Sequence, residues 1–219
     1  MADDCLPQVH AAAMRVARLG PNGAPLAGPD NLYVTDALTE LTFEPEIADG
    51  DEIEEKNANG DICVAFQADP SLKWVNVTIE ICTPDPWLES WFSQGTVIEG
   101  VGQDDPAGYA FPAIGPISSG GLSVELWTKR INNGDLDPDF PYAHWALPKI
   151  VQLRPGSRTF GAESQKPTFT GRAVENPNWN GGPIDDFIGP TDRAAQWVPA
   201  TSIPTIGCGP DAIPEPGGG

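Results

Sequence analysis

Residues 74–82 read WVNVTIEIC, and this alternation of apolar and polar side chains decides the fold. Side chains of an extended strand point in turn to opposite faces, so the stretch predicts a strand with one buried and one solvated face. The solvated face carries Asn76, Thr78 and Glu80. The buried face carries Val75, Val77, Ile79 and Ile81.

The residues after this strand predict a short helix. Pro84 ends the strand, Asp85 is a favoured N-cap, and Pro86 suits the first helical position because its missing N–H needs no partner there. Gly95 is expected to close the C-terminus. One helical face is apolar and is expected to pack on a sheet rather than to form a ligand box; it carries Trp87, Leu88, Trp91 and Phe92.

A second alternating stretch precedes the first. We expect one strand from about Leu32 to Glu46, with Leu41 and Phe43 directed to the core. The opposite face of this strand is acidic and carries Glu40, Thr42, Glu44 and Glu46.

The two strands are joined by an acidic stretch, and residues 43–63 read FEPEIADGDEIEEKNANGDIC. Seven acids fall between Glu46 and Asp61, and the stretch shows no apolar periodicity of its own. It reads as a strand end, a long loop, and the start of a short strand over residues 61–67. Because long loops without structure of their own are usually functional or mobile, we expect a mobile contact loop over residues 47–60.

Weaker patterns fill the rest of the chain. Strands are expected over residues 14–19, 122–131 and 169–174, and residues 145–153 fit either a strand or a short helix. Residues 96–121 are rich in Gly and Pro and have no assignment. With 24 Gly and 24 Pro, the chain favours many turns and few helices. We expect a single β-rich domain over residues 1–190 and an extended Pro/Gly-rich C-terminal segment over residues 191–219.

The charge of the chain disfavours nucleic acid binding. It holds 31 acidic and 12 basic residues, a net charge of −19, whereas binding a nucleic acid backbone requires a basic surface. No apolar run is long enough to span a membrane, and the acids near the N-terminus do not fit a secretion signal. We therefore expect the cytoplasm of the producing cell, where four cysteines should be reduced and buried: Cys5, Cys63, Cys82 and Cys208.

No catalytic, cofactor or metal site is expected. The chain has two histidines, no paired-cysteine motif, no phosphate-binding loop and no nucleophile elbow around its serines. The acidic clusters over residues 49–55 and 132–139 lack the spacing of a calcium-binding EF-hand loop and are better read as solvated loops.

Four segments together resemble a known family: PEIADGDEIEEKNANGDIC, SLKWVNVTIEICTPDP with its helix, LSVELWTKR and AVENPNWNGGP. They are similar to the major tail proteins, or tail tube proteins, of long-tailed phages that infect actinobacteria. The resemblance extends from about Val16 to about Asp186 and implies two packed antiparallel β-sheets with a short flanking helix and long loops. It also implies hexameric rings stacked into a virion tail tube, assembled in the host cytoplasm and bounded by other tail proteins.

In that family the long loop between early strands contacts neighbouring subunits or rings. Carried to this chain, the resemblance assigns subunit contact to Ile47, Asp49, Asp51, Glu52, Glu54, Glu55, Lys56, Asn57 and Asn59. A strand with one apolar and one acidic face also suits the wall of a channel. The candidates for the channel lining are Glu40, Glu44, Glu46 and Glu80. Acids there would repel DNA, so DNA would pass without specific binding.

Two other classes of function remain open. One is a monomeric β-sandwich module that binds a carbohydrate or another surface ligand through exposed tryptophans. The other is a hydrolase of unrecognised type.

Overall fold

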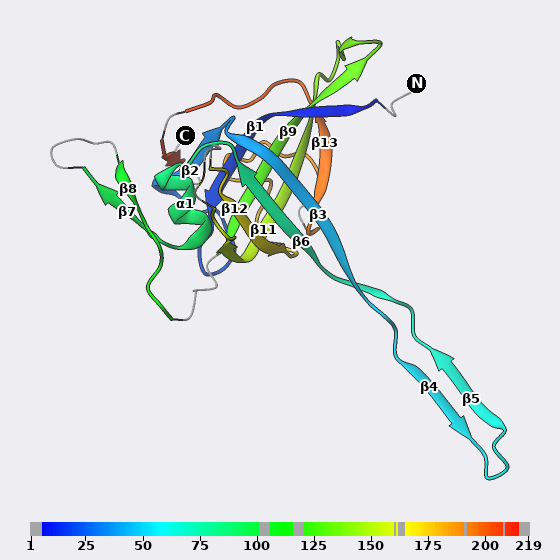
Figure 1. Ribbon diagram of the computed structural model, residues 1–219. Helices are drawn as coiled ribbons and strands as arrows, with labels where there is room; N and C mark the ends of the chain where they lie inside the picture. Colours follow the sequence, from blue (N-terminus) through cyan, green and yellow to red (C-terminus); the bar gives the residue numbers. More distant parts are fainter. Residues whose placement is uncertain are drawn as a thin grey trace.

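The computed structural model describes residues 6–100, 106–115, 121–159, 161, 165–190, 192–207 and 209–214. This part of the chain is mainly β, with antiparallel pairing throughout and one short helix beside the sheet (Figure 1). The expected fold class is confirmed. A long two-stranded projection leaves the body at one end of the sheet (Figure 1).

The main sheet has ten strands, and its principal path runs β14-β2-β1-β9-β11-β12-β6-β3, with β10 beside β9 and β13 beside β11. The bounds of these strands are β1 Gln8–Arg18, β2 Gly28–Thr35, β3 Leu38–Ala48, β6 Ser71–Ile81, β9 Leu122–Asn132, β10 Asp135–Leu136, β11 Tyr142–Pro155, β12 Thr168–Ala173, β13 Gln196–Ala200 and β14 Asp211–Ile213.

The sheet curls so that its two halves enclose one core. The apolar face of β6 is buried as its alternation predicts, and it packs in the same cluster as Met14 and Val16 of β1. Strands β9, β11 and β12 contribute Val124, Leu147 and Phe169 to this cluster. Elements at opposite ends of the path therefore share a core, which gives the barrel-like sandwich.

The helix α1, Pro86–Ser93, covers one end of this core. Asp85 caps it as expected, since its carboxylate accepts the backbone N–H groups of Trp87 and Leu88. Leu88 and Phe92 are fully buried. The C-cap, however, is Gln94 in the left-handed conformation, one residue before the expected Gly95.

Several strand predictions need correction. The single strand expected over residues 32–46 is two strands, β2 and β3, and residues 145–153 belong to strand β11. The unassigned region contains a hairpin of β7, Thr96–Glu99, and β8, Pro106–Ala110. The expected boundary at residue 190 does not mark the edge of the sheet, because β13 pairs with β11 and β14 pairs with β2.

Strand β9 is buried on both faces over residues 122–127. One face meets the main core, and the other lies under the loop that carries Trp179 and Phe187. On this second face the guanidinium of Arg15 donates to both carboxylate oxygens of Glu125, at 2.6 Å each, and also to Asp186. His144 completes the network through a contact of 2.8 Å between its Nε2 and Glu125.

Candidate functional site

The acidic stretch after β3 forms a β-hairpin and not the expected loop. Strand β4, Glu52–Lys56, pairs antiparallel with β5, Ile62–Gln67, and the pair stands clear of the body (Figure 1). Every residue of both strands is exposed. We call residues 49–70 the arm. It continues the β3 and β6 pairing into solvent, since Ala48 still faces Ser71 at its base.

The tip of the arm is an ordered turn. The side-chain oxygen of Asn57 accepts the N–H groups of Asn59 and Asp61, at 2.9 Å each, and the N–H of Asn57 donates to the Asp61 carbonyl. Gly60 has a φ of +89°, the left-handed conformation that closes such hairpin loops. The sequence KNANGD therefore specifies a turn, and this was the signal for a hairpin.

The two strands of the arm approach each other most closely at its base. The N–H of Ala68 donates to the carbonyl of Asp51, and a Cβ added to Gly50 would lie 1.7 Å from the carbonyl oxygen of Ala68. No side chain fits in that space without displacing the backbone. Gly50 is therefore required for this crossing.

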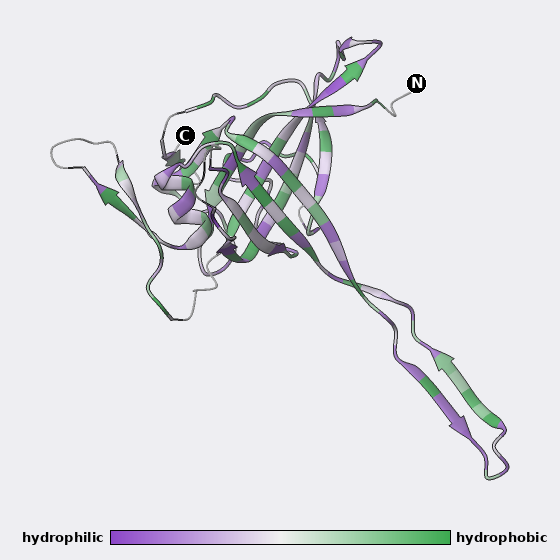
Figure 2. Cartoon of the chain, viewed as in Figure 1, coloured by the Kyte–Doolittle hydropathy of each residue, from purple (hydrophilic) through white to green (hydrophobic). Residues whose placement is uncertain are grey.

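One face of the arm is mainly apolar, although Glu55 shares it because Glu55 pairs with Val64. Ile53 lies opposite Phe66, and Val64 lies on the same face because it is two residues from Phe66. Figure 2 shows apolar residues along β5 and mostly polar residues along β4. The large apolar side chains of the arm and its base are 44 to 59% exposed, namely Ile47, Ile53, Ile62, Val64, Phe66 and Leu72. The arm thus presents an unusually apolar surface for a projection into water.

The structure brings the predicted contact residues together along one hairpin. Asp49 and Asp51 lie at its base, and Asn57 and Asn59 lie at its tip. Within β4, Lys56 forms an exposed ion pair with Glu54 at 2.8 Å. All nine residues are therefore on or beside the arm, the others being Ile47, Glu52 and Glu55.

The predicted channel residues lie on the outward face of β3 and β6. Glu40 sits directly opposite Glu80, and Glu44 sits opposite Asn76, on the side away from the buried Val77. The amide of Asn76 donates to Glu46 at 3.4 Å. The four acids Glu40, Glu44, Glu46 and Glu80 therefore share one face.

That face does not stay acidic across the sheet. Strand β12 continues it with Arg172, which lies opposite Asn76, and β11 continues it with Arg154, which donates to Thr170. Lys166 contacts Glu80 at 3.4 Å. The sequence analysis missed these bases because they enter through register with distant strands. The face is acidic along β3 and basic along β11 and β12.

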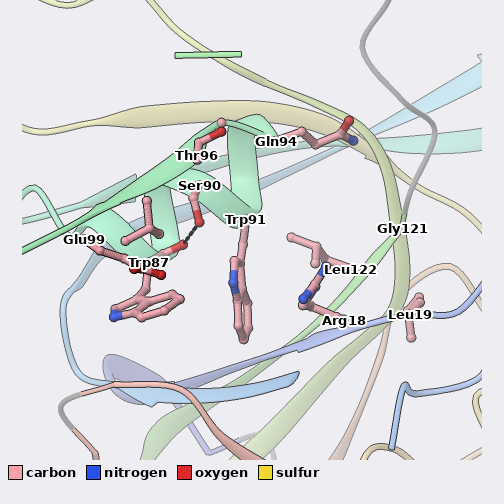
Figure 3. Close-up of a pocket in the computed structure, with 12 residues that line it drawn as sticks. Arg18, Leu19, Trp87, Ser90, Trp91, Gln94, Thr96, Glu99, Gly121 and Leu122 are labelled. Atoms are coloured by element: carbon pink, nitrogen blue, oxygen red, sulfur yellow. Dashed lines mark hydrogen bonds between the residues drawn. The ribbon is translucent and has the colours of Figure 1, made fainter. Parts of the chain in front are cut away.

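A groove lies between α1, β7 and the end of β1, with a volume of about 570 Å³. Trp87 and Trp91 project into it from α1, and Arg18 reaches in from β1 beside Leu122 of β9 (Figure 3). The guanidinium carbon of Arg18 lies 6.0 Å from the centre of the Trp91 ring. The groove thus has an aromatic wall and a cationic wall.

The groove is held open by contacts between α1 and the β7–β8 hairpin. Tyr109 of β8 is hydrogen-bonded to Ser93 of α1, and Arg158 pairs with the buried Glu89 at 2.5 Å while lying over the Tyr109 ring. Burial raises the pKa of Tyr109, although its contact with Ser93 opposes this. These contacts join the hairpin to the helix beside the groove.

The cysteine predictions are partly wrong. Cys63 and Cys82 are free thiols, but both are exposed rather than buried. They also lie apart, since Cys63 belongs to the arm and Cys82 follows β6 at the end of the strand nearest α1. Cys5 and Cys208 lie outside the described residues.

In the part of the chain that the structure describes, no cluster of three or more His, Cys, Asp or Glu side chains is arranged to hold a metal ion. None of the described helices is long and apolar enough to cross a membrane. A comparison with protein-family models finds no match to this chain, and neither does a comparison with curated proteins.

Proposed function

We propose that this protein is a structural virion subunit that polymerises as stacked hexameric rings into the tail tube of a long-tailed phage. The proposal combines the sequence resemblance with the arm. Its partners are copies of itself and the tail proteins at the two ends of the tube. DNA passes through the channel without specific binding, and the chain acts as a scaffold and not as an enzyme.

The observation that carries the proposal is the exposed apolar face of the arm. A two-stranded hairpin is marginal in water without further packing. Ile53, Ile62, Val64 and Phe66 are each about half exposed in the single chain. Because full burial of such a side chain contributes about 1.5–3 kcal/mol, covering the four exposed halves is worth roughly 3–6 kcal/mol. A contact with another subunit provides that cover.

The outward face of β3, β6 and β12 supports a channel wall. It is a largely polar surface on the far side of the main core, and Thr42, Thr78 and Thr170 form a row across its three strands. Trp74, which pairs with Glu46, adds an aromatic ring to this face beneath Arg172. Such a wall gives water and DNA a mainly polar surface. The acids of β3 lie at the edge of the sheet, where the next subunit of a ring would join.

Size-exclusion chromatography and negative-stain electron microscopy of the purified protein test the proposal. We expect rings or tubes from the natural sequence. The arm variant replaces residues 49–70 by Asn-Gly, which closes the pair of Ala48 and Ser71 with a two-residue turn. This variant should remain a folded monomer. A natural protein that stays monomeric at high concentration, or an arm variant that forms normal tubes, contradicts the proposal.

The monomeric binding module receives less support. Such a module needs exposed aromatic rings, but among the seven tryptophans only Trp197 is exposed, at 41%, and its ring packs near that of Trp145. Trp127 and Trp179 are buried. The tryptophans of this chain serve mainly to pack the core and to line the groove.

A further inference from the structure

We propose that the groove between α1 and β7 receives the arm of a second copy of this chain. The inference rests on the proposed self-assembly and identifies the surface that the arm would occupy. It follows from three features: the lining of the groove, the two faces of the arm, and the positions of both on the body.

The groove has the chemistry to hold an amphipathic acidic segment. Trp87, Trp91 and Val97 supply apolar surface, and Trp91 is only partly covered by its own chain. Arg18 lines the groove and supplies positive charge. Lys149 lies next to the lining, since its side chain approaches Gly121 of the groove wall. Neither base has a carboxylate within ion-pair distance among the described residues.

The arm offers the complementary pattern. Its mainly apolar face carries Ile53, Val64 and Phe66, and Glu55 pairs with Val64 on that face. Glu52 and Glu54 project from the opposite face of the same hairpin. A two-faced segment fits a two-walled groove if its apolar face meets the tryptophans and its acids meet Arg18 and Lys149. Glu99 on β7 lies on the α1 side of the groove and disfavours the reversed orientation.

The arm and the groove lie at opposite ends of the molecule. Strand β6 begins at Ser71 beside the arm and ends at Ile81, five residues before α1 begins at Pro86. Its 11 residues separate the two sites by about 35 Å at the usual rise of a strand. The arm, whose strands extend away from the body, therefore cannot reach its own groove (Figure 1). It can reach that of a neighbour.

A contact of this kind joins two different surfaces, so it is head to tail. A bound pair still presents one unused groove, on the copy that gave its arm, and one unused arm, on the copy that received it. Repetition of one head-to-tail contact yields a closed ring when the rotation closes and a helical filament when it does not. The geometry therefore leads to open-ended or ring assembly and not to a symmetric dimer.

The test uses two variants of the full chain and their mixture. The groove variant is Arg18→Glu with Lys149→Glu, two changes at the rim that leave the core intact. Its matched control is Lys129→Glu with Arg193→Glu, which reverses two charges outside the groove lining. The arm variant is the Asn-Gly replacement described above. Thermal unfolding confirms that each is folded, and sedimentation velocity measures its size.

We expect the natural chain and the control to assemble, and the groove variant and the arm variant each to remain monomeric. An equimolar mixture of the two monomers should then form heterodimers, because one retains an arm and the other retains a groove. If the groove variant assembles as well as the natural chain, the groove does not receive the arm and the inference is wrong. A mixture that stays monomeric overturns the inference as well. Failure of the natural chain to assemble contradicts the proposed function instead.

Discussion

Arg15 and Glu125 form a two-bond ion pair in the interior, with side chains 0 and 1% exposed. Burial alone would lower the pKa of Arg15, but the attraction of Glu125 and Asp186 raises it above its ordinary value. The guanidinium of Arg15 therefore stays charged in the folded protein. It joins β1 to β9 and, through Asp186, fixes the loop that covers the second face of β9.

Removing one partner of this pair should destabilise the protein strongly. Glu125→Gln leaves the buried guanidinium of Arg15 without its main counter-charge, and losses of about 3–5 kcal/mol are typical of such changes. The measurement is the unfolding free energy from urea titration. Asp186→Asn is the matched control, because its carboxylate is 40% exposed, and we expect about 1 kcal/mol or less. Equal losses from both substitutions would contradict this account.

Strand β6 and helix α1 were predictable because their signals are local. Alternation defined β6, and Asp85 followed by Pro86 defined the start of α1. The hairpin of the arm was not predicted because Ile53 is the only apolar residue of β4, so this strand shows no alternation of apolar and polar residues. The apolar face becomes visible only when β4 is paired with β5. The same limit applied to the outward face: Arg172 reaches the acids only through pairing of β12 with β6.

Gly50→Ala should disable the arm without unfolding the body. The added methyl group collides with the carbonyl of Ala68 and forces the two strands apart at the base of the arm. Because the arm makes no contact with the main core, we expect an unchanged melting temperature and a loss of assembly in size-exclusion chromatography. Gly60→Ala at the tip is the control. A Cβ at position 60 would lie in open space, but the φ of +89° is strained for alanine. This substitution should reduce the stability of the turn by only about 1 kcal/mol. Normal assembly of Gly50→Ala would refute the role assigned to this crossing.

The exposed cysteines report on the arm directly. Both Cys63 and Cys82 should react with a thiol reagent in the folded single chain, and peptide mass spectrometry identifies which of them is labelled. In assembled protein we expect slower labelling of Cys63, since the arm is then covered. The reference is Cys63 in the monomeric groove variant, whose arm is intact, because Cys82 follows β6 beside the helix α1 where a neighbouring arm would bind. Equal labelling rates of Cys63 in assembled and in monomeric protein would show that the arm stays in solvent.

Charge reversal on the outward face tests whether it lines a channel. Replacing Glu40, Glu44 and Glu80 by Lys should preserve the fold, since these side chains point away from the core. Together with Arg154 and Arg172, the new lysines would make this face basic apart from Glu46. Assembled tubes should then bind DNA in a salt-dependent manner, measured by filter binding at low and high salt. Variant tubes that bind DNA no better than the natural ones at low salt would show that this face does not line the channel.

Asp137 should give the protein part of its acid sensitivity. The N–H groups of Phe140 and Asp139 donate to its carboxylate, at 2.7 and 3.0 Å, and the first of these does most to lower its pKa from 3.8. A lowered pKa in the folded state means that the stabilisation is present above this ordinary value and lost as pH falls through the folded pKa.

The corresponding substitution is Asp137→Ala. Its unfolding free energy should lie below that of the natural chain near neutral pH, and the two should converge in strong acid, where the carboxylate is protonated. A difference that stays constant from neutral to strongly acidic pH would contradict a role for the charge.

The continuity of β6 from the core into the arm has a mechanical consequence. A pull on the arm acts along β3 and β6 together and draws both past the neighbouring strand β12. The force then acts as shear on the hydrogen bonds between β12 and β6, which extend from the pair of Thr168 and Glu80 to the pair of Ala173 and Val75. All of these hydrogen bonds therefore resist the force at the same time. Peeling, by contrast, breaks such bonds one after another. A fibre of these subunits under tension would therefore stretch at its joints before its individual bodies gave way.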